Sequence, residues 1–401
     1  MENIEKLAIH GGEPVIKKPL PPYYPGALFI NDKEEKSVIE VLRSKSLFRY
    51  YGPKPLFKVK SFEKMFAKYI GCRYGLGVTS GTAALFVSYR ALGLSRNDKI
   101  IIPAYTWIST PLAAVYCDAK IVIVDIDESL NMDPEVLDEV IREDVKIIVP
   151  VHMRGAPADI ESIVKIAKEN DVKVVEDVAQ SCGGSFKGKM LGSWGDMGCF
   201  SFQLNKNITA GEGGAVTTSS EELYRKAVAI HDVAAYYRDP KHNPPLPGLN
   251  FRMNEITAAI LIEQLKKIDI ILNRMRKAKK IIDEYIDKCS ELIPRKIYDG
   301  DTAVCAVFFL KNVEKARLFA KALSKEGVPA SILYSPENKY DGHIWINWKP
   351  LIEKYMIING RGKHTLNLLS KAIHISISSM IKEEDAELIG KAILKVYKHI
   401  H

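Results

Sequence analysis

Residues 145–180 read VKIIVPVHMRGAPADIESIVKIAKENDVKVVEDVAQ, and this stretch decides the fold. Two short runs rich in Val and Ile, residues 145–151 and 172–175, are typical of strands that are buried on both faces. Between them, residues 160–167 carry apolar side chains at the spacing of one helix face. A strand, a helix and a second strand in succession predict two parallel neighbours in one sheet. Functional side chains gather at the carboxyl ends of such strands.

The same alternation continues outward from this unit. Further buried strands are expected at residues 75–78, 100–102 and 121–124. One helix is expected to begin near Thr82, and another at the Asp-Pro pair 133–134, because an acid followed by a proline is typical of a helix start. The predicted class is therefore α/β, with a largely parallel sheet that helices cover on both faces.

The chain of 401 residues is long enough that two domains are a better expectation than one. Residues 1–30 are proline-rich and aperiodic, which predicts an arm lying across the surface. We expect the large domain at residues 31–265 and a smaller C-terminal α+β domain at residues 266–401. A long amphipathic helical pattern at residues 254–290 is predicted to link the two.

Composition and charge exclude several classes of protein. Hydrophobic residues make up 47% of the chain, which is ordinary for a soluble globular protein, and no stretch approaches the roughly 20 apolar residues of a membrane span. The charged first six residues lack the apolar run of a signal peptide. Six scattered cysteines without a CxxC pair favour a reducing cytoplasm over a disulfide scaffold, and no metal site is expected. The basic run at residues 274–280 is interpreted as a solvated helix face, since no aromatic-interleaved basic motif points to nucleic acid.

An acid and a lysine stand where such a sheet gathers its chemistry. Asp177 ends a hydrophobic strand, and Lys206 follows just before the glycine-rich residues 209–214. Pyridoxal 5′-phosphate (PLP) needs a lysine for its imine and a carboxylate that keeps its ring nitrogen protonated, so that the ring can accept the electrons of a carbanion. For either residue alone, a surface lysine or a helix-capping acid would be the preferred explanation.

Two further segments suit the same cofactor. Residues 79–85 turn from a strand into a helix, where small side chains and exposed N–H groups favour a phosphate. Trp107 follows another strand, and a flat aromatic there can stack on a pyridine ring. Taken singly, both have ordinary structural explanations, as a glycine turn before a helix and as a core or interface tryptophan.

Together these elements resemble the DegT/StrS-type sugar aminotransferases, a branch of the fold type I PLP enzymes. The resemblance runs from residues 7–12 through the linking helix, is most specific at residues 200–214, and is weakest in the last hundred residues. It implies a mostly parallel seven-stranded sheet in a PLP-binding large domain. It also implies a homodimer whose subunits share each active site.

The resemblance assigns roles to individual residues. Lys206 would hold PLP as a Schiff base and carry protons, and Asp177 would pair with the pyridinium. Gln180 would contact the phenolic oxygen, and Trp107 would stack on the ring. The cofactor phosphate would be held by four residues, of which the last reaches the site of the neighbouring subunit: Gly81, Thr82, Ser201 and Asn250.

The implied reaction moves an amino group from glutamate or glutamine to a keto-sugar, a nucleotide-linked keto-sugar or an inosose. A related subgroup that dehydrates its substrate has histidine at the position of Lys206, so the lysine argues against that chemistry. Two alternatives stay open: a PLP enzyme that does not transaminate, such as a dehydratase or an aminobenzoate synthase, and a PLP-binding regulatory protein.

Four residues have two interpretations each. Residues 7–12 and 47–52 are similar to the branch that acts on inososes, which makes Arg49 and Tyr51 plausible substrate contacts, with packing in a dimer arm equally plausible. His152 lies at a strand end and is a candidate for the cleft, but a satisfied structural histidine is preferred. His231 is interpreted in the same way.

Overall fold

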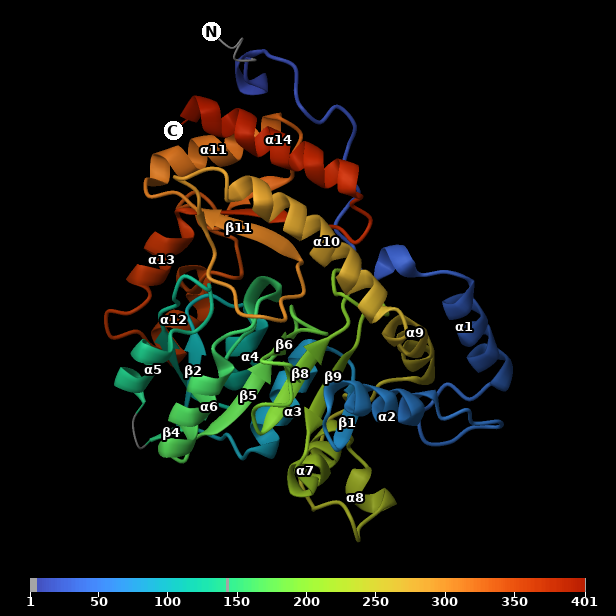
Figure 1. Ribbon diagram of the computed structural model, residues 1–401. Helices are drawn as coiled ribbons and strands as arrows, with labels where there is room; N and C mark the ends of the chain where they lie inside the picture. Colours follow the sequence, from blue (N-terminus) through green and yellow to red (C-terminus); the bar gives the residue numbers. More distant parts are fainter. Residues whose placement is uncertain (1–5, 142–143, 401) are drawn as a thin grey trace.

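The computed structural model describes residues 6–141 and 144–400, in which a main sheet lies between helices and a second, smaller sheet lies beside it (Figure 1). Spatial neighbours in the main sheet follow the order β1 (Tyr74–Val78), β9 (Gly214–Thr218), β8 (Met197–Ser201), β5 (Lys173–Asp177), β4 (Val145–Ile148), β2 (Lys99–Pro103), β3 (Lys120–Val124) and β13 (Met356–Ile357). Only β9 runs antiparallel to its neighbours. The predicted α/β class with a mostly parallel sheet is confirmed.

The sheet has one strand more than the seven that were expected. The first seven come from residues 74–218, whereas the eighth, β13, comes from the C-terminal part of the chain and pairs with the edge of β3. It contains two residues, too few for a periodic signal, so its place depends on the docking of the segment that carries it.

Helices bury both faces of the main sheet. One face packs on α3 (Gly81–Ala91), α4 (Ser109–Val115) and α7 (Glu221–His231). The other packs on α2 (Lys58–Ile70), α5 (Pro134–Val140) and α6 (Ile160–Glu169). In β2, Ile101 faces the second layer while Ile100 and Ile102 face the first, so consecutive residues are all apolar. This double burial is the reason that the strands read as unbroken apolar runs.

The smaller sheet is antiparallel, in the order β10 (Ile293–Pro294), β11 (Cys305–Phe309), β14 (Ala372–Ser376) and β12 (Ala330–Ile332). Its helices are α10 (Ile268–Ile286), α11 (Val313–Lys325) and α14 (Glu383–Ile400), which pack together above it in Figure 1. Other elements include α1 (Asp32–Ser44), α8 (Ala235–Arg238), α12 (Lys349–Tyr355), α13 (Lys363–Leu369) and the hairpin of β6 (Ser185–Phe186) and β7 (Lys189–Met190). The boundaries proposed for the two domains stay a prediction.

The linking helix is two helices, not the single one predicted over residues 254–290. α9 (Glu255–Leu265) ends before Lys267, and α10 begins after it. The ammonium group of Lys267 donates hydrogen bonds to Oε1 of Glu34 in α1 at 2.6 Å and to the carbonyl of Phe29 at 2.8 Å. Both joining residues keep near-helical backbone angles, so the apolar periodicity continues across the break.

The N-terminal segment is fastened to the small sheet's helices. Its first five residues lie outside the described part of the chain. The buried carboxylate of Glu326 accepts hydrogen bonds from the backbone N–H groups of Ala8 and Val15 and pairs with Lys395. Further along, the N–H group of Gly26 donates to the carbonyl of Lys206, so this segment reaches the main sheet as well.

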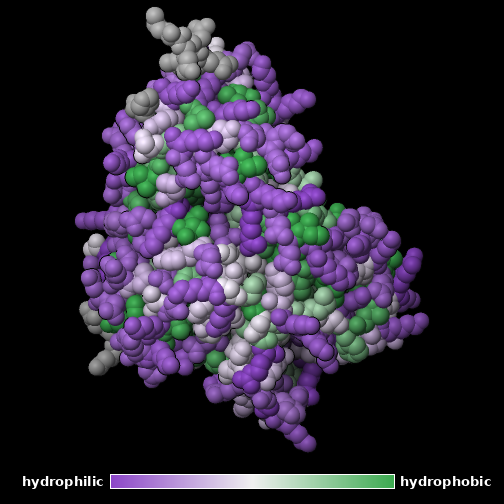
Figure 2. Space-filling model, in the orientation of Figure 1, coloured by the Kyte–Doolittle hydropathy of each residue, from purple (hydrophilic) through white to green (hydrophobic). Residues whose placement is uncertain are grey.

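The face of the molecule seen in Figure 2 is largely hydrophilic, with small separate hydrophobic areas. None of the helices in residues 6–141 and 144–400 combines the length and apolar character needed to cross a membrane.

Candidate active site

A cavity of about 580 Å³ lies at the carboxyl ends of the main-sheet strands. The segments after β1, β2, β4, β5 and β8 all contribute to it, as expected for a parallel sheet. The small sheet closes the other side with Cys305 and Ser376 of β11 and β14. Seven of the eight predicted site residues line this one cavity: Gly81, Thr82, Trp107, Asp177, Gln180, Ser201 and Lys206.

Asp177 is a buried carboxylate at the end of β5. Its Oδ2 accepts a hydrogen bond from the hydroxyl of Thr110 at 2.8 Å, and its Oδ1 accepts one from the N–H group of Ala179 at 3.1 Å. Among the described residues it accepts hydrogen bonds only from these uncharged donors, and burial raises its pKa. A cation brought into hydrogen-bond range would therefore be stabilised strongly here, as the N–H group of a pyridinium would be.

Lys206 lies in the turn after β8, held by a hydrogen bond from its N–H group to the carbonyl of Gln203 at 2.9 Å. Burial lowers the pKa of its amine, Asp177 opposes that effect, and the positive charge of Arg154 adds to it. The net effect is a lowered pKa, which shifts the lysine toward the neutral amine, the form that reacts with a carbonyl group.

The predicted phosphate site lies at the N-terminus of α3. The hydroxyl of Ser80 caps the helix by accepting from the N–H group of Ala83 at 3.1 Å, and the hydroxyl of Thr82 donates to that of Ser109 at 2.9 Å. Ser201, at the end of β8, lies close to Gly81. A Cβ atom added to Gly81 would be 2.8 Å from the Cβ atom of Ser201. The glycine allows this approach and leaves helix N–H groups available to an anion.

Trp107 and Gln180 lie between these two ends. The Trp107 side chain is 48% exposed, and its ring centroid is 4.8 Å from that of His343. The side-chain oxygen of Gln180 accepts a hydrogen bond from the backbone N–H group of Arg154 at 3.1 Å. One cavity thus holds a flat ring, a buried acid, a lysine and a helix N-terminus that can bind an anion. This combination fits PLP.

Comparisons with known proteins agree with this geometry. Residues 29–394 match the DegT/DnrJ/EryC1/StrS aminotransferase family. The chain belongs to this family. The resemblance inferred from the sequence is confirmed, and the chain is a PLP-dependent aminotransferase of the sugar-biosynthesis family.

Individual relatives cover most of the chain. An uncharacterised protein of Methanocaldococcus jannaschii is 34% identical over 332 residues, which is 79% of this chain and 84% of that protein. GDP-perosamine synthase of Escherichia coli O157:H7 is 35% identical, over 67% of this chain and 72% of the enzyme. The crystal structure of an aminotransferase from Psychrobacter cryohalolentis superimposes with a TM-score of 0.84 at 25% identity, covering 96% of this chain and all of the other.

Asn250, the eighth predicted residue, does not line the cavity of its own chain. It is exposed, in a segment whose next residue, Phe251, accepts a hydrogen bond from the N–H group of Thr79 after β1. The proposed contact with a neighbouring subunit stays a prediction for this member of the aminotransferase family.

Arg49 and His231 are packed together away from the cavity. The guanidinium of Arg49 pairs with Glu63 at 2.8 Å, donates to the carbonyl of Gly77 at 3.2 Å and approaches Nε2 of His231 at 3.3 Å. His231 is fully buried, and its Nδ1 contacts the carbonyl of Val228. Of the two interpretations for Arg49, this arrangement favours packing, whereas Tyr51 is 67% exposed.

His152 also has a structural environment. Its side chain is fully buried, with Nδ1 accepting from the N–H group of Ala158 at 3.1 Å and Nε2 lying 3.2 Å from Glu176. Because Nδ1 accepts, Nε2 carries the proton and donates to the carboxylate. This is the satisfied structural histidine that the sequence interpretation preferred.

Several cavity residues escaped the sequence analysis. Arg154 lies after β4, within the stretch of sequence that decides the fold. Its position after the end of a parallel strand is the signal that could have identified it as a cavity residue. Tyr23 comes from the N-terminal segment and His343 from a long connection before α12. Neither of these two has a local signal, because each reaches the cavity only through the packing of distant segments.

Proposed function

We propose that this aminotransferase moves an amino group from glutamate or glutamine to a ketone carbon of a keto-sugar, a nucleotide-linked keto-sugar or an inosose. The observation that carries the proposal is the shared cavity of Lys206 and Asp177, in which the lysine amine is shifted toward its neutral form and the buried acid accepts hydrogen bonds from uncharged donors. Relatives that bear the names GDP-perosamine synthase and L-glutamine:3-amino-2,3-dideoxy-scyllo-inosose aminotransferase support this substrate class.

Each residue has a defined task in this proposal. When bound, PLP supplies an aldehyde for the amino group and a ring that withdraws electrons from the reacting carbon. Lys206 would form the covalent link, and its freed amine would take the proton from the α-carbon of the donor and pass it to the cofactor. Asp177, fixed by Thr110, would hold the ring nitrogen protonated, and Gln180 would hydrogen-bond the phenolic oxygen. Trp107 would stack on the ring.

The phosphate end is assigned to residues from one helix and one strand. Gly81 and Thr82 offer the N-terminus of α3, and Ser201 offers a hydroxyl from β8. Asn250 would complete this end in the site of a partner subunit, because it is exposed and lies outside its own cavity.

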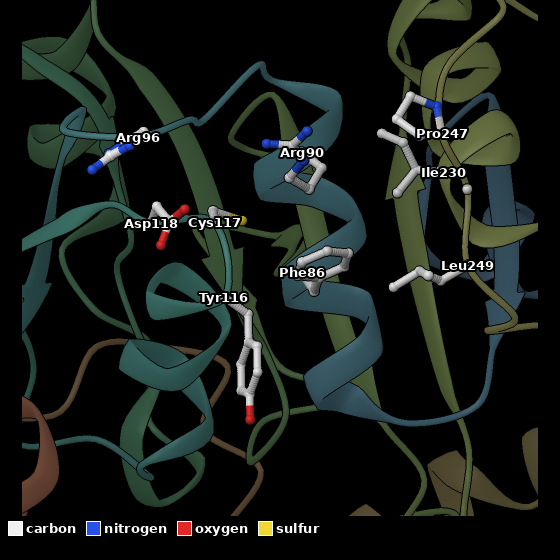
Figure 3. A pocket seen from close by; sticks show the side chains of 10 residues that line it. Phe86, Arg90, Arg96, Tyr116, Cys117, Asp118, Ile230, Pro247 and Leu249 are labelled. Atoms are coloured by element: carbon white, nitrogen blue, oxygen red, sulfur yellow. The ribbon is translucent and has the colours of Figure 1, made fainter.

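We propose a homodimer with shared active sites, and the exposed position of Asn250 outside its own cavity supports this. A second hollow of about 440 Å³ lies next to Asn250, between α3, the turn after α4 and residues 247–249 (Figure 3). Tyr116, which is 79% exposed, and Leu249, which is 53% exposed, line this hollow. We propose that this face lies near the subunit contact, and that the enzyme, whose six thiols are unpaired, works in the cytoplasm.

The first experiment locates the covalent link. Borohydride reduction of the PLP-loaded protein, followed by peptide mapping, should place the label on Lys206, and Lys206→Ala should carry none. A label at another lysine, or no label in the unsubstituted protein, would refute the assignment.

The second experiment tests the transfer itself. Isotope-labelled glutamate or glutamine is supplied with a panel of keto-sugars and inososes, and the label should appear in an amino-sugar product. The absorbance of the lysine-bound cofactor, at about 410 nm, should disappear when the donor alone is added. If the band persists with every donor, a regulatory protein is favoured. If the band disappears but no nitrogen reaches a product, a non-transaminating enzyme such as an aminobenzoate synthase is favoured; one such synthase structure superimposes with a TM-score of 0.81 at 26% identity.

A further inference from the structure

Arg154 is a cavity residue whose charge the proposed reaction does not use. It lies in the turn after β4 and is the only arginine among the described residues that line the active-site cavity. Its Nε donates a hydrogen bond to the hydroxyl of Tyr105 at 3.0 Å. Within residues 6–141 and 144–400, Nη1 and Nη2 have no hydrogen-bond acceptor, and no carboxylate lies at ion-pair distance.

The backbone at Arg154 is held in a conformation that arginine rarely adopts. Its φ of 53° and ψ of 38° lie in the left-handed region, where a Cβ atom is unfavourable. Three hydrogen bonds enforce this conformation. The Arg154 N–H group donates to Gln180 Oε1 at 3.1 Å, its carbonyl accepts from Arg295 at 3.4 Å, and the preceding N–H group donates to Asn131 Oδ1 at 2.8 Å. Strain maintained by so many contacts is common where a side chain must point into a functional site.

No carboxylate of the described residues forms a direct ion pair with Arg154. Asp341 is the acid that influences it electrostatically, but that carboxylate accepts hydrogen bonds from the N–H group and Nδ1 of His343. The other cation in the cavity, Lys206, is shifted toward its neutral form, partly by Arg154 itself. The N–H groups of Nη1 and Nη2 are available, and two such donors on one guanidinium match the two oxygens of a carboxylate.

We propose that Arg154 is a specificity-determining residue that binds a carboxylate of a reactant through Nη1 and Nη2. The inference rests on the proposed function, because it assigns the reactant class of that same site. The carboxylate belongs either to the amino-acid donor or to an acidic keto-sugar acceptor, and both offer the same chemistry to the guanidinium. Tyr105 is the positioning residue, since it fixes Nε and thereby aims the other two nitrogens.

The test measures the two half-reactions separately with Arg154→Gln. In the donor arm, the PLP-loaded protein is mixed with increasing concentrations of glutamate, and the concentration at which the rate of absorbance loss reaches half its maximum gives an apparent dissociation constant. In the acceptor arm, the protein loaded with the amino form of the cofactor is titrated with a keto-uronic acid and with the matched neutral keto-sugar. We expect the dissociation constant of the carboxylate-bearing reactant to rise about 10- to 100-fold in one arm, the range for a lost charge-assisted hydrogen bond, while the neutral sugar is unaffected.

The arm that changes identifies the source of the carboxylate. If the dissociation constants of both glutamate and the keto-uronic acid stay within about twofold of the unsubstituted enzyme, far below the effect of a lost charged contact, the inference is wrong. Arg73→Gln is the matched control, because Arg73 is exposed and does not line this cavity. Arg154→Lys, which keeps the charge but loses the planar fork, should recover part of the affinity.

Two further measurements separate this inference from folding and from the proposed function. Arg154→Gly should fold at least as readily as the unsubstituted protein, because glycine adopts the left-handed backbone conformation without penalty. This variant should still bind the carboxylate more weakly than the unsubstituted protein does. Calorimetric titration with maleate, which has two carboxylates but neither an amine nor a ketone, requires no turnover. Weaker maleate binding in both variants supports the role of Arg154 even if no transamination is found, whereas equal binding in all proteins overturns it.

Discussion

Burial acts in opposite directions on the two central side chains. It raises the pKa of Asp177 and lowers the pKa of Lys206, because a low-dielectric surrounding disfavours the charged form of each. The lysine thereby becomes a better nucleophile, and the acid becomes a strong attractor for a cation placed beside it. Burial in one cavity therefore suits both residues to the same cofactor, the lysine for reaction with its aldehyde and the acid for pairing with its ring nitrogen.

Arg49 gives the clearest test of packing against substrate binding. Its ion pair with Glu63 is about nine-tenths buried on both sides, so Arg49→Met leaves a carboxylate without its partner. We expect the free energy of unfolding to fall by about 3–5 kcal/mol, with little change in KM. Denaturant unfolding and steady-state kinetics measure the two effects. The double variant Arg49→Met, Glu63→Gln should recover part of the loss, and a raised KM with unchanged stability would mean that Arg49 contacts substrate after all.

His231 predicts a pH dependence of stability. Burial, followed by the charge of Arg49, lowers its pKa from 6.5 to about 3. The unfolded chain therefore binds this proton more readily, so the free energy of unfolding should fall as the pH drops from about 6.5 toward 3, by up to about 1.4 kcal/mol per pH unit. Denaturant unfolding at a series of pH values should show a shallower slope for His231→Gln. A difference between the two proteins that is independent of pH would contradict this expectation.

At the scale of single elements, α3 shows how a helix end becomes a binding site. Gly81→Ala would place a Cβ atom 2.8 Å from that of Ser201, so the helix N-terminus and the end of β8 would have to move apart. We expect PLP to bind at least about 10-fold more weakly, because helix N–H groups and the Ser201 hydroxyl no longer converge on the phosphate. Fluorescence titration of the apoprotein with PLP measures this.

The matched control for this substitution is Gly360→Ala. Gly360 has a φ of 79° with open space around it, so alanine there causes backbone strain but no clash. Gly360 is not among the residues that line the cavity. The substitution should lower stability without changing PLP affinity. Equal PLP affinity in the Gly81 variant and the unsubstituted protein would argue against a phosphate site at α3.

At the scale of the whole molecule, the shared site can be tested by mixing two inactive variants. Lys206→Ala removes the reactive amine from one subunit's own site, and Asn250→Ala removes the contact expected from its neighbour. If sites are shared in a homodimer, re-associated equal mixtures should regain about a quarter of the unsubstituted activity, because half of the sites in mixed dimers carry neither change. Each variant alone is the control. No recovery after confirmed subunit exchange would place Asn250 outside the partner's site.

Much of this molecule could be predicted from the sequence by itself. The Val- and Ile-rich runs and the helical spacing between them determined the parallel sheet, because burial on both faces leaves a local pattern that few other folds produce. Asp177 was identifiable because it ends such a strand, at the sheet edge where function collects. Lys206 was identifiable from the glycine-rich residues 209–214 that follow it and from the family resemblance, because the strand before it was not among those predicted.

Only the tertiary structure decided how distant segments meet. Tyr23, Arg154 and His343 converge on one cavity from three parts of the chain. Among the described residues Arg154 has no carboxylate at ion-pair distance, because Asp341 bonds to His343 instead. At the break between α9 and α10, Lys267 likewise pairs with Glu34, which is far away in sequence. Periodicity and spacing report local burial, whereas the partner of a charged side chain is selected by three-dimensional packing.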